Sequence, residues 1–255
     1  MPTAVVTGAT SGIGAVFVTH LAARGDDLVM VARDTARMEK RAEELRQAYG
    51  VQVEVLTADL SDRAQVDRVA ERVGSTTEPV ELLVNNAGFG IHSRLLSPDV
   101  MEQVDPAWEV MVRAVMVLSG AAGRAMVERG HGAILNVTST AAFMTMGAYS
   151  AIKEAATVYT EGLSNELHGT GVTATALCPG YVHTEFHERS GIRTSRLPGP
   201  LWVDADELVR DCLADVAKGK VLSIPTVRYK IGMAAARRIP RALLRRISGV
   251  LTSTR

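Results

Sequence analysis

The sequence predicts an α/β fold in which a doubly wound parallel sheet carries helices on both of its faces. Strand-like and helix-like segments alternate along the chain, and the connections between successive strands are too long for hairpins. The 255 residues are 47% hydrophobic and 22% charged, which is sufficient for one sizeable core. We therefore expect a single domain over residues 1–255, without an internal repeat or a linker.

The strands are expected at short apolar runs, and the helices where apolar residues recur at three- and four-residue spacing. The expected strands cover residues 3–7, 27–32, 51–56, 80–84, 132–138, 172–178 and 221–224. The expected helices cover residues 15–24, 34–50, 61–73, 99–129, 148–168 and 204–217. Asp34 and Ser61 are predicted to cap their helices, because their side chains accept hydrogen bonds from the first free N–H groups.

The formal net charge is zero, so the overall balance does not indicate a nucleic-acid partner. The charges are distributed unevenly, since residues 228–255 contain eight basic residues and no acidic one. These basic residues alternate with apolar ones, which predicts an amphipathic helical extension over about 228–255. Such a helix either folds over a substrate pocket, packs on a neighbouring subunit, or lies on an anionic membrane surface. We expect at most peripheral membrane contact.

The two cysteines, Cys178 and Cys212, are too few for a disulfide scaffold, and no spacing indicates a metal site. No signal peptide is recognisable, so we expect a cytoplasmic protein. The longest apolar stretch, residues 107–127, contains Glu109, Arg113 and Arg124. These three charges argue against a membrane span.

A glycine-rich turn, Thr7-Gly8-Ala9-Thr10-Ser11-Gly12-Ile13-Gly14, joins the first strand to the first helix. Glycines allow a tight turn and a close approach of the backbone to a pyrophosphate, and the helix start offers free N–H groups to the anion. The turn therefore predicts a dinucleotide site. The alternative is a tight turn without a ligand.

Several further motifs follow in a fixed order: Asp59-Leu60, Asn85-Asn86-Ala87-Gly88, Ser139, Tyr149-x-x-x-Lys153, and Pro179-Gly180 with Thr184. In these motifs and in the glycine spacing, the chain resembles the short-chain dehydrogenase/reductase family in its compact single-domain form. The resemblance covers nearly the whole chain. It implies a Rossmann-like sheet and an oxidoreductase that interconverts carbonyl and alcohol groups.

The resemblance also implies roles for individual residues. Asp59 would contact the adenine, the Asn85–Gly88 run would brace the sheet and line the adenosine side, and Thr184 would hold the nicotinamide carboxamide. The implied cofactor-binding residues are Gly8, Thr10, Ser11, Gly12, Ile13, Gly14, Asp59, Leu60, Asn86, Ala87, Gly88, Tyr149, Lys153, Pro179, Gly180, Val182 and Thr184.

The residue after the second strand indicates which cofactor is used. A carboxylate there would bind the ribose 2′-OH of NAD and repel a 2′-phosphate, but the chain has Arg33 directly after the strand. A guanidinium is suited to bidentate phosphate binding, so Arg33 predicts NADP(H). Two alternatives are that Arg33 pairs with a surface acid, or that Asp34 turns inward and accepts NAD.

Tyr149 and Lys153 are four residues apart on an expected helix and therefore share a face. A cation one turn away favours the phenolate and lowers the tyrosine pKa. By resemblance, Tyr149 is the catalytic acid or base and Lys153 tunes it and binds the nicotinamide ribose. Ser139, by the same resemblance, positions the substrate oxygen.

The chain departs from the family pattern in two places. Met111 occupies the position at which many relatives have an asparagine that anchors a water of the proton relay. Ser139 and Tyr149 are ten residues apart, which is shorter than the usual spacing and shortens the loop at 142–147. The chain is therefore either a working reductase with an altered relay, or a cofactor-binding sensor or scaffold with weak or no turnover.

The expected substrate is a small molecule, and the pocket is expected to be mostly apolar, which indicates a lipophilic carbonyl compound or alcohol. The expected lining consists of Phe89, Ile91, His92, Ala141, Phe143, Met144, Tyr181 and the loop 183–202. The helices over 99–129 and 148–168 form a dimer interface in many relatives, so we expect a homodimer or homotetramer.

Overall fold

The computed structural model of this chain describes residues 1–91, 93–182, 199, 202–236 and 238–253. Its centre is a parallel sheet of seven strands in the order β3-β2-β1-β4-β5-β6-β9. The strands are β1 (Thr3–Thr7), β2 (Asp27–Ala32), β3 (Val53–Thr57), β4 (Leu82–Asn85), β5 (Gly132–Val137), β6 (Val172–Leu177) and β9 (Leu222–Ser223). Each begins and ends within two residues of its predicted position. The order reverses between β1 and β4, which forms a crevice at the carboxyl ends of these strands.

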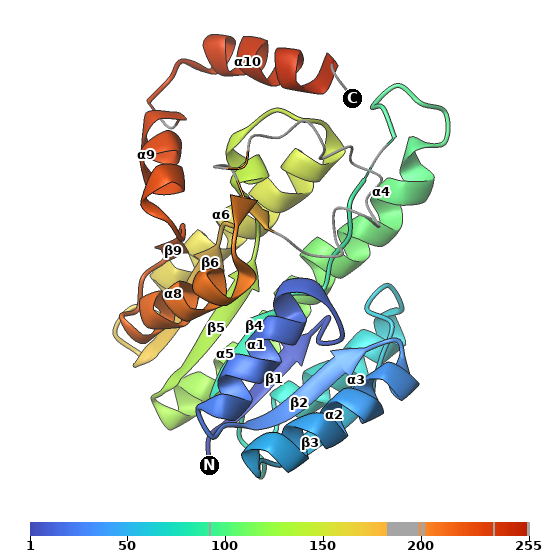
Figure 1. Ribbon diagram of the computed structural model, residues 1–255, viewed down its shortest axis with the longest axis vertical. Coiled ribbons are helices and arrows are strands. Elements are labelled where there is room, and N and C mark those ends of the chain that lie inside the picture. The colour runs from blue at the N-terminus through green and yellow to red at the C-terminus, as the bar shows by residue number, and fades with distance from the viewer. Residues whose placement is uncertain (92, 183–198, 200–201, 237, 254–255) are drawn as a thin grey trace.

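Helices cover both faces of the sheet, as predicted for a doubly wound fold (Figure 1). One face is covered by α1 (Gly12–Ala23), α2 (Thr35–Tyr49) and α8 (Ala205–Ala217). The other face is covered by α3 (Arg63–Val73), α5 (Ala114–Arg129) and α6 (Ala148–Glu166). Phe17 and Leu21 of α1, and Leu118 and Met126 of α5, are fully buried against the sheet. These two apolar layers hold the strand ends in place.

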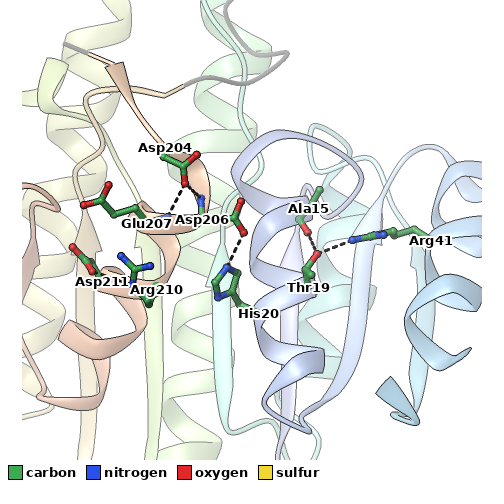
Figure 2. A network of polar contacts seen from close by, with 9 residues as sticks. All are labelled: Ala15, Thr19, His20, Arg41, Asp204, Asp206, Glu207, Arg210 and Asp211. Atoms are coloured by element: carbon green, nitrogen blue, oxygen red, sulfur yellow. Dashed lines mark hydrogen bonds and ion pairs between the residues drawn. The ribbon is translucent and has the colours of Figure 1, made fainter. Parts of the chain in front are cut away.

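Polar contacts join α1 to its neighbouring helices on one face (Figure 2). His20 Nε2 on α1 lies 3.0 Å from the Asp206 carboxylate on α8. Arg41 on α2 donates to Thr19 Oγ1 on α1 at 2.6 Å, and this hydroxyl donates to the Ala15 carbonyl at 2.8 Å. The helix that follows the glycine turn is therefore held on both sides by side chains as well as by the core.

The predicted helix over 99–129 is continuous but changes its winding midway. It consists of α4 (Val100–Trp108), a π-helical turn (Glu109–Arg113) and α5. In the described part of the chain, Val100–Arg129 is the one helix that is long and apolar enough to cross a membrane. The charges that we expected to argue against a span therefore do not settle the question by composition. Of its apolar window, 61% is buried inside the protein, as in a core helix.

The segment after β9 forms two helices, α9 (Val227–Ala236) and α10 (Arg241–Ser253), where the sequence predicted one basic helical extension. Both lie beyond the carboxyl ends of the central strands, at the end of the molecule opposite the N-terminus (Figure 1). A separate two-stranded pair, β7 (Tyr181–Val182) and β8 (Trp202–Val203), follows β6.

One predicted helix cap is confirmed and the other is wrong. The Asp34 side chain accepts a hydrogen bond from the first turn of α2, as predicted. The cap of α3 is Asp62 and not Ser61, since the Asp62 carboxylate accepts from two N–H groups of the first turn at 2.9 and 3.3 Å. Ser61 instead donates its N–H and its hydroxyl to Asp59. A carboxylate one residue nearer to the helix reaches the free N–H groups directly.

Replacing Asp62 by alanine is expected to lower the free energy of unfolding, because the first turn of α3 loses its cap. The matched variant Ser61→Ala leaves the cap intact and should cost less. Urea denaturation of both variants measures the difference. Equal losses in the two variants would contradict the assignment of the cap to Asp62.

Candidate active site

Glycines shape the turn between β1 and α1, and two of them leave no room for a side chain. A Cβ on Gly14 would lie 2.2 Å from the Gly8 carbonyl oxygen, and a Cβ on Gly8 would lie 2.9 Å from Ala87 Cα. Gly8 and Gly12 have φ values of 67° and 55°, which glycine adopts without a steric penalty. The Ser11 side chain does not cap α1, so an anion at this turn can accept from the first N–H groups of the helix.

The loop after β4 is fastened to this turn by Thr7 and Asn86. Thr7 Oγ1 accepts from the N–H groups of Asn86 and Ala87 at 2.9 and 3.1 Å. The Asn86 side-chain amide donates to the carbonyl groups of Thr7 and Gly8 at 3.0 and 3.2 Å. These four hydrogen bonds bridge the crevice where the strand order reverses. Thr10 and Ile13 are partly buried on the same turn, and Gly88 is exposed at the end of the opposite loop.

Arg33 and Asp59 lie at the carboxyl ends of β2 and β3. An Arg33 guanidinium nitrogen is 3.8 Å from the Asp59 carboxylate, and 77% of the Arg33 side chain is exposed. Burial raises the pKa of Asp59, but the hydrogen bonds from Ser61 and the charge of Arg33 outweigh this, so the pKa lies below its ordinary value. The next residue, Leu60, is buried. The structure therefore places a carboxylate and an accessible guanidinium beside the glycine turn.

Ser139, Tyr149 and Lys153 converge at the carboxyl end of β5. Ser139 caps a short 3₁₀ helix, Thr140–Phe143, which follows β5. Its Oγ accepts a hydrogen bond from the Ala141 N–H at 3.1 Å. Tyr149 lies in the first turn of α6, near enough to Ser139 for that side chain to influence the pKa of the phenol. Lys153 Nζ lies 5.8 Å from the centre of the Tyr149 ring. The three predicted catalytic side chains thus form one group.

The Lys153 amine is buried, and it donates to the Val137 carbonyl at 2.9 Å. Burial lowers the pKa of Lys153 to about 8, and the Cys178 thiol group opposes part of this shift. Burial raises the pKa of Tyr149 to about 12, and the hydrogen bond with Ser139 opposes it. We expected the lysine to lower the tyrosine pKa, but the burial of the phenol outweighs any such effect and raises that pKa.

The two departures from the family pattern have different structural outcomes. The short loop still leaves Ser139 and Tyr149 close enough to interact, so it is tighter without separating them. Met111 is buried in the π-helical turn. A Cβ on Gly88 would lie 2.9 Å from Met111 Sδ and 3.7 Å from Lys153 Nζ, so the thioether and the amine border the same glycine. A thioether is only a weak acceptor and does not replace a side-chain amide.

The segment after β6 closes this side of the site. Pro179 is buried, and Val182 in β7 is 3% exposed. Gly180 packs so closely on Tyr229 of α9 that a Cβ there would lie 2.0 Å from the ring, and the Tyr181 N–H donates to the Tyr229 hydroxyl at 3.1 Å. His92 and most of the predicted lining loop 183–202, including His183 and Thr184, lie outside the described residues.

Comparison with known proteins identifies the family. Residues 2–193 match the model of the short chain dehydrogenase family. The chain belongs to this family. A short chain dehydrogenase of Pseudocercospora fijiensis is 35% identical over 189 residues, which are 72% of this chain and 60% of that relative. The family consists of oxidoreductases that act on alcohol and carbonyl groups.

Two solved structures of short-chain dehydrogenases agree over nearly the whole chain. A short-chain dehydrogenase from Sphingobium yanoikuyae in complex with NADPH has a TM-score of 0.83 and 32% identity, over 93% of this chain and 94% of its own. A bulky-bulky ketone specific alcohol dehydrogenase from Comamonas testosteroni has a TM-score of 0.80 and 30% identity, over 95% and 96% of the two chains.

The sequence analysis did not identify a chain of buried polar groups behind this short-chain dehydrogenase site. The Asn85 amide donates to Asn136 Oδ1 at 2.9 Å and to Ser119 Oγ at 3.1 Å, and the Asn136 amide donates to Thr160 Oγ1 at 2.9 Å. These bonds join β4, β5, α5 and α6. The available signal was an asparagine inside an apolar strand, because a buried amide requires partners.

Lys153 is expected to titrate near pH 8 in the cofactor-free protein, against 10.5 for an unperturbed lysine. The folded protein then binds this proton more weakly than the unfolded chain, so the cost of burying the charge is full below pH 8 and disappears between pH 8 and 10.5. The stability of the wild type relative to Lys153→Met should therefore rise with pH in this window, by on the order of 3 kcal/mol.

Urea unfolding at several pH values measures this difference, and NMR of isotope-labelled lysine measures the titration directly. The exposed Lys40, replaced by methionine, is the control for the loss of a lysine from the surface. A Lys153 amine that titrates at the ordinary value would show that the site is wetter than its burial indicates.

Proposed function

We propose that this protein interconverts a lipophilic carbonyl compound and its alcohol with NADP(H) as the cofactor. The observation that carries the proposal is the grouping of Ser139, Tyr149 and Lys153: the Ser139 side chain lies near enough to influence the pKa of the Tyr149 phenol, and the Lys153 amine lies 5.8 Å from the centre of the same ring. Such a group can orient a carbonyl oxygen and exchange a proton with it. The glycine turn and the start of α1 supply the matching cradle for a pyrophosphate.

Each side chain has a separate task in the proposed reaction. When bound, the nicotinamide supplies or accepts the hydride. The Ser139 hydroxyl accepts a hydrogen bond from the Ala141 N–H, and its interaction with Tyr149 places it where a substrate oxygen would meet the phenol. With a pKa of about 12, Tyr149 is protonated at neutral pH and can donate that proton as the oxygen becomes negative. The nearby Lys153 ammonium then stabilises the phenolate that remains.

The preference for NADP(H) is supported by two residues after β2. Arg33 has an exposed guanidinium beside the predicted adenosine side, and its partner Asp59 is 3.8 Å away, which leaves room for a phosphate to compete. Asp34 is engaged as the cap of α2, which argues against the alternative in which it turns inward to bind the ribose of NAD. The relative from Sphingobium yanoikuyae was solved with NADPH.

A bulky, lipophilic substrate is supported by the loops around the site. The loops after β4, β5 and β6 carry apolar side chains: Phe89, Ile91, Phe143, Met144 and Tyr181. The alcohol dehydrogenase from Comamonas testosteroni is named for bulky-bulky ketones, and it shares the fold over 95% of this chain. The transfer of a hydrocarbon-rich ketone from water to such an apolar lining would be favourable.

Tyr149→Phe is expected to lower the turnover of a ketone panel by about 10²- to 10⁴-fold, because the proton donor is lost. NADPH affinity should change little, since the phenyl ring keeps its place. Tyr159→Phe is the matched control on the same helix; its hydroxyl donates to the Met116 carbonyl, away from Ser139. Steady-state kinetics and fluorescence titration measure both effects. Tight NADPH binding without turnover in the wild type would favour the sensor or scaffold instead.

Arg33→Ala is expected to weaken NADPH binding by about 10- to 100-fold and to leave NADH binding nearly unchanged, because only the 2′-phosphate loses a charged partner. Lys40→Ala removes an exposed positive charge from the following helix, α2, and should change the binding of neither cofactor. Calorimetric titration of the two cofactors measures the ratio. An unchanged ratio in Arg33→Ala, or tighter binding of NADH by the wild type, would refute the NADP(H) assignment.

A further inference from the structure

The helices α9 and α10, which we call the C-terminal helical pair, are fixed over the active site by their inner face. The Tyr229 hydroxyl of α9 accepts the Tyr181 N–H at 3.1 Å. The Ser248 hydroxyl of α10 accepts the Thr145 N–H at 3.2 Å, from the short loop between Ser139 and Tyr149. Both contacts reach loops at the carboxyl ends of the strands. The pair therefore has a defined inner side.

Burial along the pair agrees with these contacts. Met233 of α9 and Leu244 of α10 are 7% and 9% exposed, and Ser248 is fully buried. Leu244 and Ser248 are four residues apart and share one face of α10. Arg246 lies two residues from each of them, which places it on the opposite face of the helix. The sequence of α10 thus separates an inner face from an outer one.

The outer face combines exposed cations with exposed apolar side chains. Val227, Ile231 and Leu243 are 68%, 67% and 48% exposed. The exposed basic residues of the pair and its connection are Arg228, Lys230, Arg238, Arg241, Arg245 and Arg246. We call these nine residues the basic outer face. Large apolar side chains at this exposure remain in water unless another surface covers them.

The positive charge of this face indicates what kind of partner surface would cover it. Residues 228–255 contain eight basic residues and no acidic one, although the whole chain is neutral. Arg241 of this face forms an ion pair with Glu154 of α6 at 3.2 Å. The family model ends at residue 193, so this charge lies outside the part that the model describes.

We propose that the basic outer face docks on an anionic lipid bilayer, with the cations at the headgroups and Val227, Ile231 and Leu243 inserted among them. Basic residues combined with apolar ones on a surface helix are the pattern of interfacial binding. A nucleic acid would use the cations but would leave the exposed aliphatic side chains in water. The bilayer is therefore the partner that satisfies both parts of the face.

Docking in this way would turn the carboxyl ends of the strands toward the bilayer, because the inner face of the pair rests on the loops of the site (Figure 1). The proposal does not depend on the proposed reaction, since vesicle binding needs neither cofactor nor substrate. Failure of one therefore leaves the other unaffected.

The test is co-sedimentation of the full chain with vesicles of phosphatidylcholine alone and of an equimolar phosphatidylcholine–phosphatidylglycerol mixture. We expect binding only to the anionic vesicles, and weaker binding as salt rises above about 100 mM. Three exposed cations are neutralised in the main variant: Arg238→Gln, Arg245→Gln and Arg246→Gln. Each charge contributes about fivefold to partitioning, so the triple variant should bind on the order of 100-fold more weakly.

A matched control removes three exposed charges elsewhere: Lys40→Gln, Arg210→Gln and Lys218→Gln. It should bind like the wild type. A second variant, Ile231→Ser with Leu243→Ser, keeps every charge and tests insertion; it should weaken vesicle binding and leave binding to poly(U) RNA unchanged. Thermal melting and sedimentation velocity of each variant verify that fold and oligomeric state are retained.

Three results would overturn the proposal. The first is no binding of the wild type to anionic vesicles at low salt. The second is an equal loss in the control triple variant, which would indicate attraction by any surface charge. The third is undiminished vesicle binding in Ile231→Ser/Leu243→Ser together with tight binding of poly(U), which would indicate a general polyanion site.

Discussion

The hydrogen bonds between Thr7 and the Asn86 loop hold together the two halves of the nucleotide crevice. β1 and β4 are adjacent in the sheet, but the chain leaves them in opposite directions, and their following loops would otherwise diverge. Asn86 donates to two carbonyl groups of the glycine turn, and the space left by Gly8 and Gly14 allows this approach. The turn, the start of α1 and the loop after β4 therefore form one rigid cradle.

The same sheet also positions the reactive side chains, of which Lys153 is buried. Lys153 is held by a β5 carbonyl group, and the chain of Asn85, Asn136 and Thr160 fixes β4 and β5 relative to α6. A buried network of satisfied amides resists small shifts of these elements, since any displaced group would lose its partner. This rigidity explains how a phenol and an amine four residues apart keep a fixed relation to Ser139 on another element.

Hydrophobic periodicity and the glycine spacing were sufficient to predict the sheet and the glycine turn, whereas the grouping of Ser139, Tyr149 and Lys153 was implied by the family resemblance. Features that depend on the exact backbone position of a single residue could not be predicted in this way. Asp62 and Ser61 are both good caps, and only the backbone decides which of them reaches the helix. The pKa direction of Tyr149 was wrong because spacing shows the neighbouring cation but not the burial that outweighs it. The π-helical turn around Met111 has no distinctive composition.

The short loop between Ser139 and Tyr149 and the C-terminal helical pair are best understood together. A short loop can make few contacts within itself, yet this loop must keep Ser139 and Tyr149 close together. Ser248 supplies a partner for the Thr145 N–H of this loop, and Tyr229 supplies one for the segment after β6. Both come from beyond residue 193, where the family model ends. These two hydrogen bonds thus tie loops of the site to a segment that lies outside the family motifs, and that segment also carries the basic outer face.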